Sequence, residues 1–316
     1  MGKCIVGIDL GGTKAAAAAA GLDTTPSLQT VETIATGKDQ QPEQLLEKVA
    51  DLARKVAAGR EMVAVGLGAP GLLDLQRGVC VFSGNLGWRE VPVATELSRL
   101  LSAPVYMDND VRVAALGEMT QGAARGHSDF IYLTVGTGIG SGIFTDGKLL
   151  QGPKYAAGEV GHMVLKPDGP ACTCGSHGCL EALASATAIV REAALAAEMQ
   201  PGCLPEAITA REVARLAAQG NPVARQVWDE AMGWLGIGVA NLVNIFNPAL
   251  VVIGGGVSLA GDMLLNPVHE KVEQLAMPVQ RGHVKLALSA LGDKAGVAGA
   301  LELAKTGQNI REGSKQ

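Results

Sequence analysis

The sequence predicts an α/β protein with two domains. Its 316 residues exceed what one small core needs and suit two domains. Segments typical of strands alternate with segments typical of helices along the chain. A buried strand, a turn of Gly and Thr, and a returning strand occur twice, at residues 5–20 and 130–145. This repetition predicts two similar α/β halves, 1–120 and 121–295, that meet near residues 122–126.

In the N-terminal half, an apolar run predicts a buried strand over Lys3–Leu10. Ala15–Ala20 is predicted to be its hairpin partner, although alanine favours helices. Apolar residues at helical spacing predict a helix over Gln41–Ala58. The other elements expected in this half are strands at 62–67 and 105–107 and helices at 91–101 and 111–121.

The C-terminal half is expected to repeat this pattern. Its predicted strands are 130–135, 141–144, 250–253 and 285–287, and its predicted helices are 180–199, 210–218, 222–246 and 262–275. A closing helix is predicted after this half, at 296–305. The apolar stretch Trp234–Phe246 is interpreted as core rather than as a dimer interface. The polar tail from Thr306 is expected to fray.

Composition excludes some classes of partner. Apolar residues make up 47% of the chain and aromatic residues 3%, so the cores are expected to consist of Val, Leu, Ile and Ala. The net charge of −5 and the absence of a basic block argue against nucleic-acid binding, which needs clustered Lys and Arg. No apolar run reaches the roughly 18 residues that span a membrane. No secretory signal is recognised, and we expect a cytoplasmic protein without a membrane partner.

Three cysteines and a histidine form the most specific motif. Cys172, Cys174 and Cys179 lie within eight residues, and His162 lies ten residues upstream of the first. This spacing suits one tetrahedral zinc ion. His177 competes for the fourth position, but a ligand from outside the loop, His162, closes the tetrahedron better. The six cysteines show no spacing typical of a disulfide framework. Because four protein ligands leave no open coordination position on the zinc ion, a structural zinc site is predicted.

Two glycine-rich turns are candidate phosphate sites. In the run Asp9–Lys14, backbone N–H groups of the glycines can approach phosphate oxygens, and the strand-terminal Asp9 can hold Mg²⁺ through its water shell. The run is not a Walker A loop, which needs a longer spacing. A plain hairpin turn is the alternative interpretation. The second turn, Gly136–Gly140, occupies the matching place in the other half, which strengthens both assignments.

Other polar or glycine-rich turns can complete a ligand site. The carboxylates and amide of Asp108-Asn109-Asp110 can accept a proton from a hydroxyl and orient it, although helix capping is the competing role. The turn Gly254–Gly256 can let a purine lie against bare backbone, or it can simply begin a helix. The remaining candidates for the walls of a polar pocket are Gly71, Asn85, Glu159, His162 and Glu181.

These motifs, in this order, resemble the ROK family, which contains bacterial sugar kinases and repressors. The resemblance spans residues 3–305 and includes Gly158-Glu159-Val160-Gly161-His162. It implies a two-domain actin-like ATPase fold (ribonuclease H-like) with an interdomain cleft, and a last helix, 296–305, that packs on the N-terminal domain. Within the family, the chain is most similar to ATP-dependent bacterial glucokinases.

The resemblance also implies roles for individual residues. Asp110 would be the base that activates the sugar 6-hydroxyl, and His162 would use one ring nitrogen for zinc and the other for the sugar. ATP would be bound with Mg²⁺, its phosphates between the two glycine turns. The sugar-binding residues would be Gly71, Asn85, Asn109, Asp110, Glu159, His162 and Glu181. The nucleotide-binding residues would be Asp9, Gly11, Gly12, Thr13, Lys14, Gly136, Thr137, Gly138, Gly254, Gly255 and Gly256.

Glucose is the sugar that this resemblance favours. The alternatives within the family are kinases for N-acetylmannosamine, N-acetylglucosamine, fructose or allose, and polyphosphate is an alternative donor. The chain departs from the family pattern at Gly152–Tyr155, where smaller residues are expected. Outside the kinases, a sugar-sensing repressor would carry a helix-turn-helix before the first strand, and a chaperone-like ATPase would need a further peptide-binding region. We expect a homo-oligomer, either a dimer or a tetramer.

Overall fold

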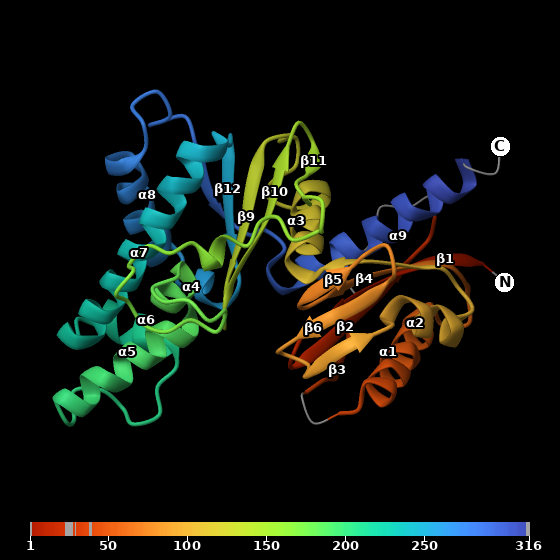
Figure 1. Cartoon of the computed structure of the whole chain (residues 1–316), viewed down its shortest axis with the longest axis horizontal. Coiled ribbons are helices and arrows are strands. Elements are labelled where there is room, and N and C mark those ends of the chain that lie inside the picture. The colour runs from red at the N-terminus through yellow and green to blue at the C-terminus, as the bar shows by residue number, and fades with distance from the viewer. Residues whose placement is uncertain (1, 23–27, 29, 38–39, 314–316) are drawn as a thin grey trace. The chain divides into compact units, whose positions relative to one another are not determined.

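The computed structural model describes residues 2–22, 28, 30–37 and 40–313, with side chains described up to residue 307. It divides into two units (Figure 1). Unit 1 comprises Met1–Gly126, Leu149–Ala157 and Ala290–Gln316, and unit 2 comprises His127–Lys148 and Gly158–Ser289. The segment Leu149–Ala157 therefore belongs to unit 1, whereas the sequence analysis assigned it to the C-terminal half.

Unit 1 is built on a five-stranded mixed sheet. Its strands, in spatial order, are β3 (Glu32–Ala35), β2 (Lys14–Ala20), β1 (Lys3–Leu10), β4 (Glu61–Ala69) and β8 (Val105–Asn109). Strand β2 is antiparallel to both β3 and β1, whereas β1, β4 and β8 run parallel to one another. The predicted alanine-rich hairpin strand is confirmed, because pairing with β1 on one side and β3 on the other outweighs the helical preference of alanine.

Helices cover both faces of this sheet. Alternate β1 residues Val6 and Ile8 pack with α1 (Pro42–Ala57) and α2 (Val93–Leu101), whereas Ile5 packs with α9 (Ala295–Gly313) on the opposite face. Helix α9 comes so close to β4 that a Cβ atom on Gly66 would collide with the backbone of Ala300. Helix α3 (Asp110–Gln121) packs along α9. Helix α9 ends at Gly313. The tail that was predicted to fray from Thr306 is thus helical as far as Gly313, and the prediction is wrong for these residues.

A three-stranded sheet in unit 1 was not expected from the sequence. It consists of β5 (Leu72–Asp74), β6 (Val79–Ser83) and β7 (Trp88–Val91). Its strands are three to five residues long, too short for a clear alternation of apolar and polar residues. Val91 ends β7, so the helix predicted from that residue begins at Val93 instead.

Unit 2 repeats the topology of the first sheet. Its strands, in spatial order, are β11 (Lys148–Leu149), β10 (Ile139–Thr145), β9 (Phe130–Val135), β12 (Leu250–Gly254) and β13 (Lys285–Leu288). Again an antiparallel hairpin, β9–β10, is followed by parallel strands. The two-fold pattern predicted from the glycine turns is thus present in the order and direction of the strands.

The helices of unit 2 gather around one long apolar helix. They are α4 (Leu180–Ala184), α5 (Ala186–Met199), α6 (Ala210–Ala218), α7 (Pro222–Phe246) and α8 (Asp262–Leu275). Helix α7 buries Leu235, Val239 and Val243, which supports its interpretation as core. The single helix predicted over 180–199 is wrong. The backbone is extended at Ser185, whose hydroxyl accepts the N–H of Ala188 and starts α5 as a separate helix.

Three short 3₁₀ helices complete the secondary structure of the described residues: η1 (Val160–His162), η2 (Gly256–Ala260) and η3 (Gly292–Lys294). Within the described part of the chain, no helix is both long and apolar enough to cross a membrane.

A buried carboxylate fixes the segments at which the chain leaves and re-enters unit 1. Glu118 on α3 has no exposed surface. Its side chain accepts hydrogen bonds from the backbone N–H groups of Ala123 at 2.7 Å, Leu291 at 3.0 Å and Ala290 at 3.3 Å. Because several N–H groups converge on one carboxylate, its burial is compensated and both segments are tied to α3.

Candidate functional site

In unit 1, the candidate catalytic residues lie at the carboxyl ends of parallel strands. Asp9 on β1 pairs in register with Gly68 on β4, and Gly68 pairs with Asp108 on β8. The acidic groups of two separate sequence motifs therefore reach the same edge of one sheet. Open α/β sheets bind ligands at this edge, because the loops that follow the strands diverge there.

The three residues of the Asp108-Asn109-Asp110 motif have different local roles. Asn109 caps α3, since its side-chain oxygen accepts the N–H groups of Val111 at 3.0 Å and Arg112 at 3.3 Å. Asp108 is buried in an ion pair with Arg112. Asp110 is the first residue of α3 and is partly buried. The capping role and the proposed chemical role therefore fall on different residues of the motif.

Asp9 and Asp110 influence each other electrostatically. Burial raises the pKa of Asp9 from its ordinary value of 3.8 to about 7, and the negative charge of Asp110 adds to this increase. Lys14 opposes it, although its ammonium group also lies 3.3 Å from Asp293 on the surface. A divalent cation with oxygen ligands would offset the repulsion between these two carboxylates.

The first glycine turn is held by a backbone hydrogen bond and by the side chain of Thr36. The N–H of Gly11 donates to the carbonyl of Lys14 at 2.9 Å, and the hydroxyl of Thr36 donates to the carbonyl of Gly11 at 2.7 Å. A Cβ atom on Gly12 would lie 2.9 Å from Cβ of Asn85. The structure therefore brings the predicted pocket residue Asn85 beside this turn.

Gly71 has a structural reason to be glycine. Its φ of 109° lies in a region that L-residues rarely adopt, and a Cβ atom there would press on the backbone of Phe82 and Ser83. This close packing accounts for the glycine without a ligand, and its predicted contact with sugar stays a prediction.

In unit 2, the two remaining glycine turns lie against each other. The turn after β9 is closed by the N–H of Gly136 donating to the carbonyl of Gly138 at 2.9 Å. Thr187 on α5 donates to the carbonyl of Thr137 at 2.8 Å. A Cβ atom on Gly255, which has a φ of 83°, would lie 2.5 Å from the carbonyl oxygen of Val135 at the end of β9. The sheet therefore places the predicted phosphate turn and the predicted purine turn side by side.

A cavity of about 310 Å³ opens beside Gly256. Its walls are mostly apolar, with Ala214 on α6, Trp228 on α7 and Val257 on η2 among them, and Arg211 and Arg215 contribute charge. Nothing lies within 4 Å of a Cβ atom placed on Gly256. A flat apolar group can therefore reach the backbone at this glycine.

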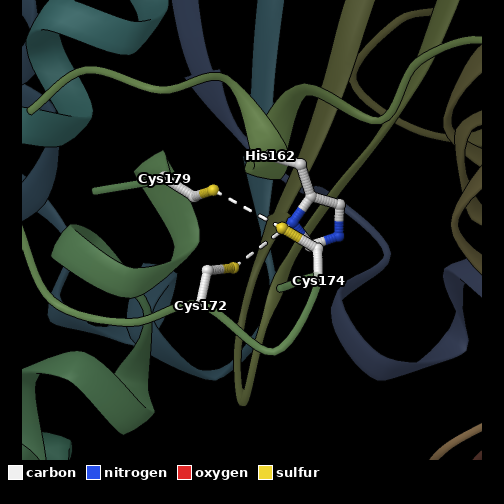
Figure 2. Close-up of side chains that lie close together, drawn as sticks. All are labelled: His162, Cys172, Cys174 and Cys179. Atoms are coloured by element: carbon white, nitrogen blue, oxygen red, sulfur yellow. Dashed lines mark hydrogen bonds between the residues drawn. The ribbon is translucent and has the colours of Figure 1, made fainter. Parts of the chain in front are cut away.

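The predicted metal ligands converge in unit 2 (Figure 2). One donor atom each from His162, Cys172, Cys174 and Cys179 lies within 4.8 Å of the others. Nδ1 of His162 is 3.6 Å from Sγ of Cys172, and Sγ of Cys174 is 3.7 Å from Sγ of Cys179. Zinc–sulfur bonds of about 2.3 Å place tetrahedral ligand atoms about 3.8 Å apart. The donor set therefore fits zinc, and His162 rather than His177 is the histidine within it.

Backbone hydrogen bonds shape the segment Cys172–Cys179, here named the metal loop after its predicted role. The N–H of Cys172 donates to the carbonyl of Ser176 at 2.8 Å, and Leu180 donates to the carbonyl of Met163 at 2.9 Å. A hydrogen bond from the backbone of Ser176 lowers the pKa of Cys174, whereas burial raises the pKa of Cys179 to about 12. Metal binding at this cluster would therefore release protons from the thiols.

The two predicted sugar-binding carboxylates flank the metal cluster. Glu159 is exposed and directly precedes η1, which carries His162. Glu181 on α4 accepts hydrogen bonds from the N–H of Ile139 at 3.0 Å and from the hydroxyl of Thr173 at 3.2 Å. Glu181 is thus already engaged with both the glycine turn and the metal loop.

The chain is similar in sequence and in fold to known proteins over nearly its whole length. A sequence model described as the ROK family matches residues 5–307. The chain belongs to the ROK family. It is 37% identical over 309 residues to a glucokinase of Thermotoga maritima, a match that covers 95% of this chain and 97% of that protein. The crystal structure of a ROK family glucokinase from Streptomyces griseus, in complex with glucose and AMPPNP, matches with a TM-score of 0.84 and 34% identity, over 96% of this chain and 99% of that one.

The ROK family also contains regulators that resemble this chain. A xylose repressor of Caldicellulosiruptor bescii is 35% identical over 267 residues, which cover 82% of this chain and 66% of the repressor. The fold of the chain is the two-domain actin-like ATPase fold of ROK glucokinases, as the sequence analysis predicted.

Several residues of this ROK protein that contact the candidate site were missed by the sequence analysis. Thr36, Ser141, Thr173 and Thr187 each donate a hydroxyl hydrogen to a site segment, and Arg112 pairs with Asp108. Isolated hydroxyl residues carry no spacing signal. Arg112 follows Asp108 by four positions, and this helical spacing was the one available hint.

Proposed function

We propose that this chain is an ATP-dependent hexokinase that transfers the γ-phosphoryl group of ATP to the 6-hydroxyl of glucose. The observation that carries the proposal is the similarity to glucokinases over nearly their whole length. The related Streptomyces griseus glucokinase was crystallised in complex with glucose and AMPPNP, which supports both substrates. N-acetylmannosamine, N-acetylglucosamine, fructose and allose are the alternative acceptors.

In unit 1, we assign Asp110 as the base that accepts the proton of the attacking hydroxyl. Its place at the start of α3, beside the capping Asn109, supports this role because the helix start is rigidly held. Asn109 uses its oxygen for the cap, which leaves its amide hydrogens for a sugar hydroxyl. Asp9 would hold Mg²⁺ through water, and the cation would neutralise phosphate charge.

The phosphate assignment extends to both glycine turns. Gly11, Gly12, Thr13 and Lys14 in unit 1, and Gly136, Thr137 and Gly138 in unit 2, would donate to phosphate oxygens. Such donors matter because the transition state of phosphoryl transfer is loose and depends on positioning and charge neutralisation.

In unit 2, we assign the cavity beside Gly256 to the adenine base. Support comes from its apolar walls, its volume of about 310 Å³ and its place after the Gly254–Gly256 turn, which packs on the predicted phosphate turn. Glu159, His162 and Glu181 would bind sugar hydroxyls. In unit 1, Gly71 and Asn85 are assigned as sugar-binding residues.

Zinc at the Cys172, Cys174, Cys179 and His162 cluster would act structurally. Four protein ligands leave no position for substrate, so the ion would stabilise the loop rather than take part in the chemistry. Bound through Nδ1, His162 would present its other nitrogen to the sugar, with the ring orientation set by the metal bond. The homo-oligomeric state and the cytoplasmic location stay predictions.

The proposal is tested by ADP release from the purified protein with Mg-ATP and a panel of sugars: glucose, mannose, fructose, allose, N-acetylglucosamine and N-acetylmannosamine. We expect the highest kcat/KM with glucose. A higher value with another sugar would replace glucose as the acceptor. Polyphosphate in place of ATP tests the donor, and sugar 6-phosphate is then measured directly.

A second candidate is a sugar-sensing regulator without catalysis. The similarity to a xylose repressor over 82% of this chain favours considering it. A protein that binds a sugar in calorimetry but transfers no phosphoryl group from ATP or polyphosphate would support the regulator and refute the kinase.

A further inference from the structure

We propose that Asp108 and Arg112 are positioning residues that hold the segment Gln151–Tyr155, here named the strap, against the start of α3, and that this contact sets the affinity for the acceptor sugar. The part of the inference that concerns sugar affinity rests on the proposed kinase function. The attachment of the strap to the start of α3 does not depend on that function.

The ion pair itself is buried. Nε and Nη2 of Arg112 lie 2.7 Å and 2.5 Å from Oδ1 of Asp108, and the two side chains are 5% and 8% exposed. Removing two charges from water costs free energy, and a buried pair recovers that cost only with further hydrogen bonds. A buried ion pair therefore need not stabilise the folded protein. The groups that contact the remaining polar atoms of Asp108 and Arg112 indicate what this pair does.

Both remaining ends of the pair reach the strap. Oδ2 of Asp108 accepts a hydrogen bond from Nε2 of Gln151 at 2.9 Å. Nη1 of Arg112 donates to the carbonyl oxygen of Tyr155 at 2.5 Å. The pair thus has one contact at each end of the strap, although the strap lies about forty residues further along the chain.

The strap has a defined and strained backbone. Tyr155 has a φ of 56°, a left-handed conformation that is uncommon for residues other than glycine. The N–H of Tyr155 faces the carbonyl of Gly152 at 3.3 Å, and the N–H of Ala157 donates to the carbonyl of Gln151 at 3.0 Å. Strain of this kind persists where surrounding contacts determine the conformation, and here the Arg112 contact holds the carbonyl of the strained residue.

The ion pair and the strap lie close in sequence to two residues proposed to act on the sugar. Asp108 precedes the proposed base Asp110 by two residues, and Tyr155 precedes Glu159 by four. One ion pair therefore fixes the backbone next to the base and the backbone that leads to Glu159. Because a misplacement of about 1 Å can cost about 100-fold in rate, release of the strap should weaken use of the sugar. It should change the use of ATP much less.

The main test compares Arg112→Met with Arg225→Met. Arg225 forms an ion pair with Asp229, also four residues apart on a helix, but that pair is exposed. We expect Arg112→Met to raise the KM for glucose about tenfold or more, with the KM for ATP within about twofold of the wild type, while Arg225→Met changes neither. Hydrogen exchange of the peptide 149–162 should be faster in Arg112→Met only.

Two further variants keep the test decisive if Arg112→Met unfolds. Gln151→Ala removes one strap contact and leaves the ion pair, so it should raise the glucose KM and the exchange rate by smaller factors. Tyr155→Gly keeps the carbonyl and suits a positive φ, so it should leave the glucose KM unchanged. An increase in KM with Tyr155→Gly would show that the tyrosine ring, not the pinned backbone, affects the sugar, and would overturn the inference.

The exchange measurement separates this inference from the proposed function. If the wild type phosphorylates no sugar, the kinase proposal fails, while strap exchange in Gln151→Ala and Arg112→Met still tests the attachment. Unchanged exchange in both variants would overturn the attachment itself. Faster exchange with an unchanged glucose KM would keep the attachment and refute its effect on sugar affinity.

Discussion

Glu181 accepts a hydrogen bond from the backbone nitrogen of Ile139 at 3.0 Å. Its other carboxylate oxygen accepts the hydroxyl hydrogen of Thr173, in the metal loop, at 3.2 Å. A Cβ atom on Gly138 would collide with the same carboxylate. One side chain therefore links the cysteine cluster to the glycine turn, so that the proposed metal site and the proposed phosphate site share a support within unit 2.

Replacing Glu181 with Gln should impair both substrates. An amide has one acceptor oxygen, so it cannot accept from both Ile139 and Thr173, and its NH₂ group would face one of these donors. We expect kcat/KM to fall about 100-fold or more, with higher KM values for glucose and for ATP in steady-state kinetics. Glu192→Gln, a change on the surface of α5, is the control. An unchanged KM for ATP would mean that the link to the glycine turn has no functional weight.

Replacing Cys174 with Ser should remove zinc and weaken sugar binding together. The cluster loses one of four ligands, and His162 loses the metal bond that would orient its ring. Metal analysis should find one zinc per wild-type chain and almost none in the variant, and calorimetry should show weaker glucose binding. Cys203→Ser, outside the cluster, should retain both. A zinc-free variant with normal glucose affinity would separate the metal from the sugar site.

Replacing Asp110 with Asn should nearly abolish turnover while sugar binding persists. The amide keeps the shape of the side chain but accepts no proton, and a positioned base contributes about 10²–10⁴-fold to the rate. Turnover is measured by ADP release and glucose affinity by calorimetry. Asp51→Asn, an exposed change on α1, is the matched control. Activity close to that of the wild type would remove Asp110 from the role of base.

The pH dependence of stability should reveal the buried carboxyl of Asp9. Its pKa is raised from 3.8 to about 7 in the folded protein, so between these values the folded state holds a proton that the unfolded chain releases. Stability from this group is therefore present below about pH 4 and is lost as pH rises through 7. Asp9→Asn has no such loss.

The measurement is the melting temperature of the nucleotide-free protein from pH 4 to pH 8. The Tm of Asp9→Asn minus that of the wild type should increase over this range and then level off, by about 2–6 °C in total. The variant should also lose most of its turnover with Mg-ATP. Parallel pH profiles for the two proteins would show that Asp9 ionises normally.

Replacing Glu118 with Gln should destabilise unit 1. The carboxylate accepts N–H groups of Ala123, Ala290 and Leu291 without any exposure to water. An amide keeps one acceptor oxygen but places an NH₂ group where the other stood, so at least one buried N–H is left unpaired, at a cost of about 1–3 kcal/mol. Denaturant unfolding with and without the substitution measures the loss, and Glu47→Gln on the surface of α1 provides the reference. Equal unfolding free energies would mean that water or a shifted backbone replaces the carboxylate.

Local sequence patterns were sufficient for much of this protein. The spacing in the Cys172–Cys179 loop predicted a cluster with His162, and the structure brings these four residues together. Asp9–Lys14 and Gly136–Gly140 lie at strand ends as predicted, and their phosphate-binding role stays a prediction. Most helices and strands followed from periodicity in the same way. Periodicity did not predict the small sheet β5–β7, because its strands are too short to show an alternation of apolar and polar residues. It also did not predict the break between α4 and α5 at Ser185, which depends on a single hydroxyl.

Tertiary structure alone decided which partner each polar side chain takes. Glu181 and Ile139 are 42 residues apart, and Asp108 and Gln151 are 43 apart. Nothing in the composition of either segment specifies the other. The sequence by itself determined that apolar layers cover two similar sheets and that the chain carries a cysteine-rich loop and acidic turns. The pairings arise only when those layers pack, because a hydrogen bond depends on distances of a few tenths of an ångström that the whole fold sets.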